Sequence, residues 1–171
     1  MLNALLDDGS SQTFINSDVI KELGIEESNE RKVAISELNS NNELVHTSDV
    51  TFEISSLDKL NKSKISAMTA KQVVGDMKAT DWNTEKTKFS HLKGICFPKV
   101  SARKKVDILI GIDYPHLHSS IQEKVGQLGD PIARLTPLGW TCIGKTNDRE
   151  KRESHHTWSA KSLCLRKSKI N

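Results

Sequence analysis

Residues 4–10, Ala-Leu-Leu-Asp-Asp-Gly-Ser, lead an apolar strand directly into a turn that carries two carboxylates, a glycine and a hydroxyl. A second apolar run, residues 107–113, reads Asp-Ile-Leu-Ile-Gly-Ile-Asp and predicts a buried strand. Its Gly111 allows another segment of backbone to approach closely. One carboxylate alone does little hydrolysis at neutral pH, whereas two carboxylates a few ångströms apart share a proton and can activate water. The acidic turn therefore predicts half of a site that needs a partner.

The composition predicts one compact domain followed by a basic tail. The chain has 171 residues, of which 36% are hydrophobic and 5% aromatic, which is enough for one core. Residues 145–171 hold eight basic and three acidic residues, so the basic excess lies at the end of the chain. We expect a folded domain over residues 1–146 and a disordered basic tail over 147–171, which would contact nucleic acid only nonspecifically.

The cysteines and the hydropathy pattern indicate the cellular compartment of the protein. Cys96, Cys142 and Cys164 are odd in number and widely spaced, which argues against a disulfide framework and against a metal site. No window approaches the roughly 18 apolar residues of a membrane span, and the N-terminus lacks the pattern of a secretory signal. We therefore expect an intracellular, cytoplasmic protein with no metal, no cofactor and no membrane partner.

The region between the two apolar runs has the pattern of β-structure. Alternating apolar and polar residues predict a hairpin with a polar tip, then a half-buried strand, then a weaker strand, at residues 32–46, 49–55 and 64–74. A short helix is expected over residues 18–23, ending at Gly24. Residues 75–105 show no sustained period and predict a long surface excursion, part of which would cover the site or adopt short helical turns.

Three blocks of sequence in a fixed order carry a family resemblance. The acidic turn, ILIGIDY at 108–114 and TPLGWTCIG at 136–144 resemble the retropepsin-type aspartic peptidase domain of BEL/Pao retroelement polyproteins. The resemblance covers roughly residues 2–144. It implies a mainly β fold, a small closed acid-protease barrel with one or two short helices, which dimerises about a two-fold axis. Because few residues precede Asp7, this barrel would be truncated at its N-terminus.

The resemblance also implies roles for individual residues. Asp7 matches the catalytic aspartate, so that Asp7 from each chain of a homodimer would flank one water and hydrolyse an extended polypeptide substrate of the retroelement polyprotein. Gly9 would let the two turns meet, and Ser10 would hydrogen-bond the outer oxygen of the Asp7 carboxylate. Ile110 and Gly111 match the strand that supports the turn.

The tip of the predicted hairpin falls where this family has a flap. Ser36, Asn39 and Asn41 would therefore lie over the substrate, and closure of the flap would exclude water and supply backbone groups to an extended peptide.

One departure from the family pattern leaves a second reading open. The family usually has Thr or Ser after the catalytic aspartate, and this chain has Asp8. Two Asp8 carboxylates that approach each other would repel, unless one is protonated or turned outward. The alternative is a catalytically inactive, decayed or domesticated peptidase-like domain that acts as a binding module.

Three further side chains have simpler interpretations. Trp140 is expected to pack in the core, since large aromatic side chains usually bury. His116 and His118 follow the second apolar run and are expected to be exposed loop groups that bind no metal.

Overall fold

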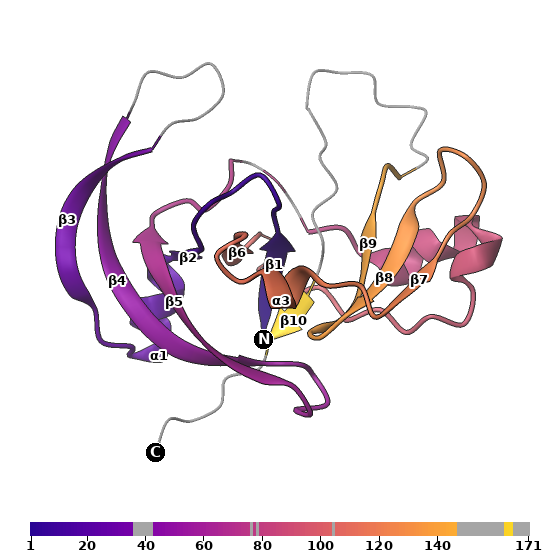
Figure 1. The fold of residues 1–171 in the computed structure, drawn as a ribbon, viewed down its shortest axis with the longest axis horizontal. Coiled ribbons are helices and arrows are strands. Elements are labelled where there is room, and N and C mark those ends of the chain that lie inside the picture. The colour runs from indigo at the N-terminus through magenta and orange to yellow at the C-terminus, as the bar shows by residue number, and fades with distance from the viewer. Residues whose placement is uncertain (36–42, 76, 78, 104, 147–162, 166–171) are drawn as a thin grey trace.

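The computed structural model describes residues 1–35, 43–75, 77, 79–103, 105–146 and 163–165. Within these residues the strands form a seven-stranded sheet in the order β10-β1-β6-β2-β5-β4-β3 and a three-stranded sheet in the order β7-β8-β9 (Figure 1). The strands of the large sheet are β1 (Leu2–Leu6), β2 (Phe14–Asn16), β3 (Ser28–Ile35), β4 (Glu43–Ser55), β5 (Lys62–Ala70), β6 (Ile108–Ile110) and β10 (Leu163–Leu165). Those of the small sheet are β7 (Gln122–Lys124), β8 (Ile132–Thr136) and β9 (Gly139–Ile143).

The helical elements are short. They are α1 (Ser17–Leu23), α2 (Trp82–Glu85), α3 (Pro115–His118) and the 3-10 turns η1 (Lys86–Lys88) and η2 (Ser90–Leu92). The prediction of a mainly β chain with few short helices is confirmed. None of the helices in the described ranges is long and apolar enough to cross a membrane.

The large sheet is open, so the predicted closed barrel is wrong for the described strands. β3 pairs with β4 at one end of the sheet, and β10 pairs with β1 at the other. The sheet curves strongly along β3, β4 and β5 (Figure 1), but the two edge strands do not close on each other. The long β4 explains part of this shape: it pairs with β3 and β5 along its length, and so carries the sheet outward as an arm.

The centre of the large sheet places two distant segments side by side. β1 runs parallel to β6, with Leu6 opposite Ile110, and β2 runs antiparallel to β6 on its other side. Residues 7–13 therefore cross the end of β6 to connect β1 with β2. This arrangement brings the acidic turn and the residues after β6 to the same end of the sheet.

The apolar runs become the main core. Ala4, Leu6, Ile108 and Ile110 are buried together with the apolar side chains of β4 and β5. The apolar face of α1 closes one side of this core through Val19 and Ile20. Burial of this kind contributes about 1.5–3 kcal/mol for each large aliphatic side chain, so the ends of β1 and β6 are firmly held.

The predicted hairpin forms, but its tip falls outside the described residues. β3 pairs antiparallel with β4, with Val33 opposite Val45. The two alternating stretches at 43–46 and 49–55 make one continuous strand, β4. Ser36, Asn39 and Asn41, the predicted flap residues, lie in the part of the chain that the structure does not describe.

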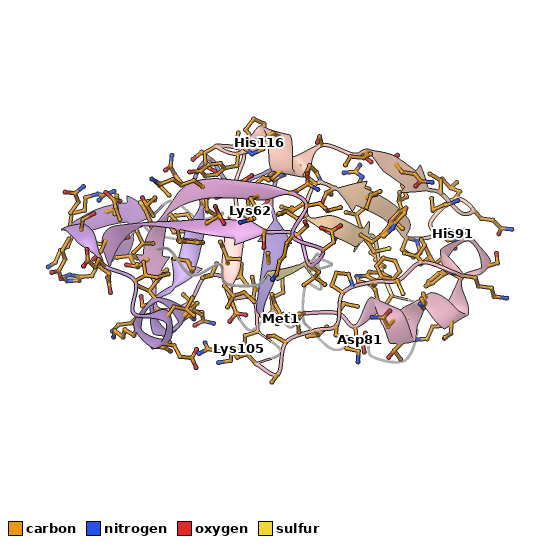
Figure 2. All side chains as sticks on the ribbon, turned by 90° about the horizontal axis from the view of Figure 1, so that it is seen from below. Met1, Lys62, Asp81, His91, Lys105 and His116 are labelled. Carbon is orange, nitrogen blue, oxygen red and sulfur yellow. The ribbon has the colours of Figure 1, made fainter. Side chains whose placement is uncertain are left out.

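Much of the predicted surface excursion folds into a second core. Five side chains between residues 82 and 97 pack on Ala133 of β8 and Cys142 of β9: Trp82, Phe89, Leu92, Ile95 and Phe97. The Trp82 side chain is 1% exposed. Figure 2 shows Asp81 and His91 in this half of the molecule, well apart from Lys62 on β5. The expected short helical turns are present at residues 82–92, but the prediction of a surface excursion is wrong for the buried side chains of residues 82–97.

Part of the predicted tail is also paired. Residues 163–165 form β10, which lies antiparallel to β1 with Leu2 opposite Leu165. These three residues are not the unpaired chain that the composition suggested. Residues 147–162 and 166–171 lie outside the described part.

Candidate functional site

The acidic turn continues the pairing of β1 with β6 by one residue. The Asp7 backbone N–H donates to the Ile110 carbonyl at 3.0 Å, and the Ser10 N–H donates to the Asp7 carbonyl at 3.3 Å. The Gly9 N–H donates to Asp7 Oδ1 at 2.9 Å. The Asp7 side chain is half-buried, whereas Asp8 is exposed. Asp7 is thus a carboxylate with a fixed orientation at the surface end of a buried strand.

Gly111 lies directly beneath this turn. The Ile112 N–H donates to the Ser10 carbonyl at 2.9 Å, which brings the two backbones together. A Cβ atom at position 111 would lie 2.6 Å from the Gln12 carbonyl oxygen and 2.7 Å from that of Ser10. Only glycine fits this approach without moving the turn. The structure thus places Ile110 and Gly111 directly against the acidic turn.

Ser10 has a different partner from the one expected. Its hydroxyl donates to the Gln12 carbonyl at 2.7 Å, within the same turn. The expectation that it binds the Asp7 carboxylate is therefore wrong for the single chain. The bond stabilises the second half of the turn and leaves the Gly9 N–H as the group that orients the Asp7 carboxylate.

Thr13 and Asp113 form a polar clamp that the sequence analysis did not assign. The Asp113 carboxylate accepts the Thr13 backbone N–H at 3.1 Å and its hydroxyl at 2.7 Å. The Thr13 hydroxyl in turn accepts the Gly111 N–H at 3.1 Å. The clamp ties the end of the turn to the residues after β6. The only sign of this clamp in the sequence was that Thr13 and Asp113 are polar residues at the ends of apolar stretches.

His118 is the second residue that sequence reasoning missed. Its Nδ1 lies 2.6 Å from Asp8 Oδ1, and its Nε2 lies 2.9 Å from the Gly111 carbonyl oxygen. The His118 side chain is 12% exposed, so the prediction of an exposed loop group is wrong for this residue. His116 is exposed as expected, and its Nε2 lies 3.5 Å from the Ser63 hydroxyl. Asp8 is 66% exposed and turned toward α3.

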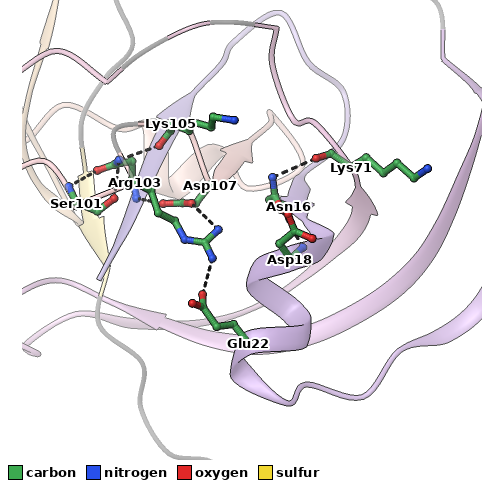
Figure 3. A network of polar contacts seen from close by, with 9 residues as sticks. Asn16, Asp18, Glu22, Lys71, Ser101, Arg103, Lys105 and Asp107 are labelled. Atoms are coloured by element: carbon green, nitrogen blue, oxygen red, sulfur yellow. Dashed lines mark hydrogen bonds and ion pairs between the residues drawn. The ribbon is translucent and has the colours of Figure 1, made fainter.

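A buried polar network fixes the opposite end of β1 (Figure 3). The Asn3 side chain donates to the Ser101 hydroxyl at 2.8 Å and to the Lys105 carbonyl at 2.7 Å. The Asn3 backbone N–H donates to Asp107 Oδ2 at 2.8 Å. Burial raises the pKa of the Asp107 carboxyl, and the Asn3 N–H and the Arg103 guanidinium oppose that rise. The network holds the start of β1 to the start of β6, so both ends of this strand pair are anchored.

The remaining predicted residues are placed as follows. Trp140 is half-buried and packs against the second core. Within the described ranges, no group of three or more His, Cys, Asp or Glu side chains is arranged to hold a metal ion.

The chemistry that this site offers follows from the Asp7 carboxylate, since those of Asp8 and Asp113 are bound by His118 and Thr13 of the same chain. A lone carboxylate at the surface can accept a hydrogen bond or a proton, but the acid and base steps of peptide hydrolysis need two groups in different protonation states. The described site supplies one such group together with a rigid support. Comparison of the chain with protein-family models, curated proteins and solved structures finds no match.

Proposed function

We propose that this chain is one half of an aspartic endopeptidase, active as a homodimer, that hydrolyses extended segments of a retroelement polyprotein. The observation that carries the proposal is the support beneath Asp7. β1, β6 and Gly111 hold the acidic turn through backbone bonds on both sides, at a contact too close for any larger residue. A surface turn with no role in chemistry does not need such support, because it can relax toward solvent.

The proposed mechanism uses Asp7 from both chains. Two carboxylates that face each other cannot both ionise, so one is protonated and the other is charged. The charged Asp7 takes a proton from a water molecule held between them, and the water attacks the scissile carbonyl. The protonated Asp7 donates a hydrogen bond to the carbonyl oxygen. The tetrahedral intermediate then collapses: its C–N bond breaks as the proton taken from water passes from that Asp7 to the leaving nitrogen, and no covalent enzyme intermediate is formed.

The hairpin of β3 and β4 is suited to bind an extended substrate. It extends beyond the rest of the large sheet toward residues 36–42 (Figure 1). Extended peptides are commonly bound by backbone hydrogen bonds to strands, with specificity from alternate side chains. In the proposed dimer, Ser36, Asn39 and Asn41 are the candidate substrate contacts at the tip.

Asp8 favours a second candidate, the inactive binding module. It adds a carboxylate to each turn at the place where two turns would meet, and like charges at an interface oppose association. A chain that no longer cleaves would lose nothing by this change. The two candidates share the fold and differ in whether a dyad of Asp7 residues forms.

The decisive experiment measures peptide cleavage by the full chain. Purified wild type is incubated from acidic to neutral pH with a mixture of unfolded proteins, and new peptide termini are identified by mass spectrometry. We expect cleavage by the wild type and its loss in Asp7→Asn, with Asp18→Asn as the matched control, since Asp18 is an exposed acid on α1. Cleavage that persists in Asp7→Asn rejects the proposal. An inert wild type that forms a stable dimer favours the binding module.

A further inference from the structure

His118 joins two parts of the acidic site. Its ring lies between the Asp8 carboxylate and the Gly111 carbonyl, so it bridges the turn and the residues after β6. The short helix that carries His118 is anchored in the main core, because its Leu117 is 1% exposed there. The ring is thus a rigid bridge, although it comes from an element of only four residues.

The two acceptors determine where the hydrogens lie. A carbonyl oxygen can only accept, so His118 Nε2 must carry a hydrogen to bond Gly111. At 2.6 Å, a second hydrogen must also lie between Nδ1 and Asp8 Oδ1, because two lone pairs would otherwise face each other. Whether that hydrogen is held by Nδ1 or by Oδ1, the His118–Asp8 pair as a whole carries no net charge.

We propose that His118 is a positioning residue, whose ring turns Asp8 onto its own chain and neutralises its charge. In the proposed dimer, which this part of the inference takes as given, the ring removes the repulsion that two Asp8 carboxylates would cause. The family's hydroxyl at this position would link one turn to the other. Here the His118–Asp8 pair within each chain takes the place of that link.

The neighbouring ionisable groups have partners of their own. Asp7 accepts the Gly9 N–H, and Asp113 accepts both polar groups of Thr13. The Tyr114 hydroxyl bonds the backbone of Ser66. His116, two residues away on α3, faces Ser63 on β5. Among these groups the short contact with Asp8 is specific to His118.

The first test needs neither a dimer nor cleavage. Nitrogen-15 NMR of the histidine rings in the full chain reports which nitrogens carry hydrogen. We expect His118 Nε2 to carry a hydrogen and the Nδ1 signal to shift in Asp8→Asn, while the signals of His116 stay unchanged. A bare Nε2 in the wild type, or an Nδ1 signal unmoved by Asp8→Asn, overturns the pair.

The second test measures the consequence for association. Sedimentation equilibrium compares wild type with His118→Gln, Asp8→Asn, the double variant and the control His116→Gln. We expect His118→Gln to weaken the dimer about tenfold or more, because the contact that holds Asp8 on its own chain is then lost. The double variant should recover most of this loss. If His118→Gln weakens the dimer equally in the wild-type and Asp8→Asn backgrounds, the ring acts only through packing. That result rejects the proposed neutralisation.

The two tests separate this inference from the proposed function. If the NMR result holds and no dimer forms at any concentration, the pair stands and the peptidase proposal fails. If dimers form and cleave substrate but the His118 signal does not respond to Asp8→Asn, the reverse is true.

Discussion

At the scale of single residues, Gly111 is the position where the acidic turn tolerates least change. Gly111→Ala would place a Cβ atom 2.6 Å from one backbone carbonyl oxygen and 2.7 Å from another. Neither backbone can move without disturbing the bonds of the turn, so we expect a loss of about 1–3 kcal/mol in the free energy of unfolding. Urea unfolding followed by circular dichroism measures this loss.

Gly75→Ala is the matched control for this substitution. A Cβ atom at Gly75 meets no other atom within 4 Å, and its backbone is not in the left-handed region. We expect a change within about 0.5 kcal/mol. Equal effects of the two substitutions would show that the close contact at Gly111 does not stabilise the fold.

A second residue-scale prediction concerns Asp107, whose carboxyl is 2% exposed. Burial raises its pKa in the folded chain above the ordinary value of 3.8. The folded state then holds the proton more tightly than the unfolded state, so the contribution of Asp107 to stability is fully present below 3.8 and is lost as pH rises through the folded pKa. Asp107→Asn should remove this dependence. Unfolding free energies measured across acidic pH, wild type against variant, give the difference.

Asp49 provides a control of opposite sign. The Arg31 guanidinium and the Asn29 amide lower its pKa below 3.8, so its contribution is present above 3.8 and is lost as pH falls through the folded pKa. Asp49→Asn should therefore change the pH dependence in the other direction, and weakly, since the pair is exposed. A dependence that is the same in wild type and Asp107→Asn would contradict the assigned burial of that carboxyl.

At the scale of elements, the strands that build the site could be predicted and the segments that brace it could not. β1 and β6 are continuous apolar runs, and such runs have few alternatives to a buried strand. The contact of His118 with Asp8 joins residues 110 positions apart through a four-residue helix. A contact between residues so far apart leaves no periodic pattern in the local sequence. The spacing of the two histidines in α3 therefore gave no indication of it.

The second core escaped prediction for a related reason. Trp82, Phe89 and Phe97 are buried by a chain of short helical turns and loops, which has neither the period of a helix nor that of a strand. Their burial is decided by the strands β8 and β9, which come later in the sequence. The only signal in the sequence was the apolar content of this irregular segment. It indicates that these side chains are buried, but not against which strands.

The burial of the second core allows a prediction at the scale of elements. Cys142 on β9 is buried beneath the residues that follow Trp82, and burial raises the pKa of its thiol to about 12, whereas Cys96 is exposed. Because the thiolate is the reactive form, a thiol reagent should label Cys96 rapidly and Cys142 very slowly in the native chain. Peptide mapping after timed labelling separates the two sites.

Trp82→Ala should expose Cys142 without affecting Cys96. Removal of a buried tryptophan costs about 3–5 kcal/mol, and the layer over β9 then opens more often. Leu60→Ala serves as the control, since that side chain is 81% exposed. Fast labelling of Cys142 in the wild type would mean that this layer does not cover the small sheet.

At the scale of the whole molecule, the fold holds the Asp7 carboxylate where another molecule can reach it. The strands β1, β6 and β2 are buried, but the turn lies at their end, so Asp7 is half-buried and Asp8 is exposed. If hydrolysis needs two Asp7 carboxylates, as proposed, a two-fold axis next to the turn is the simplest way to supply the second. The resemblance predicted such a dimer from the sequence, while the orientation of Asp8 toward α3 became evident only from the structure.

Mixing of subunits tests whether activity belongs to the pair. If wild type and Asp7→Asn chains are mixed in equal amounts and exchange freely, about a quarter of the dimers keep two Asp7 residues. Cleavage should then fall to about a quarter of that shown by pure wild type at the same total chain concentration. Chains that worked singly would retain about half of the activity, because the wild-type chains would be unaffected by their partners. The two values are far enough apart to measure by peptide cleavage, with wild type mixed with Asp18→Asn as the control that should show no loss. A fall to only half would place the chemistry within one chain and remove the need for a dyad across the axis.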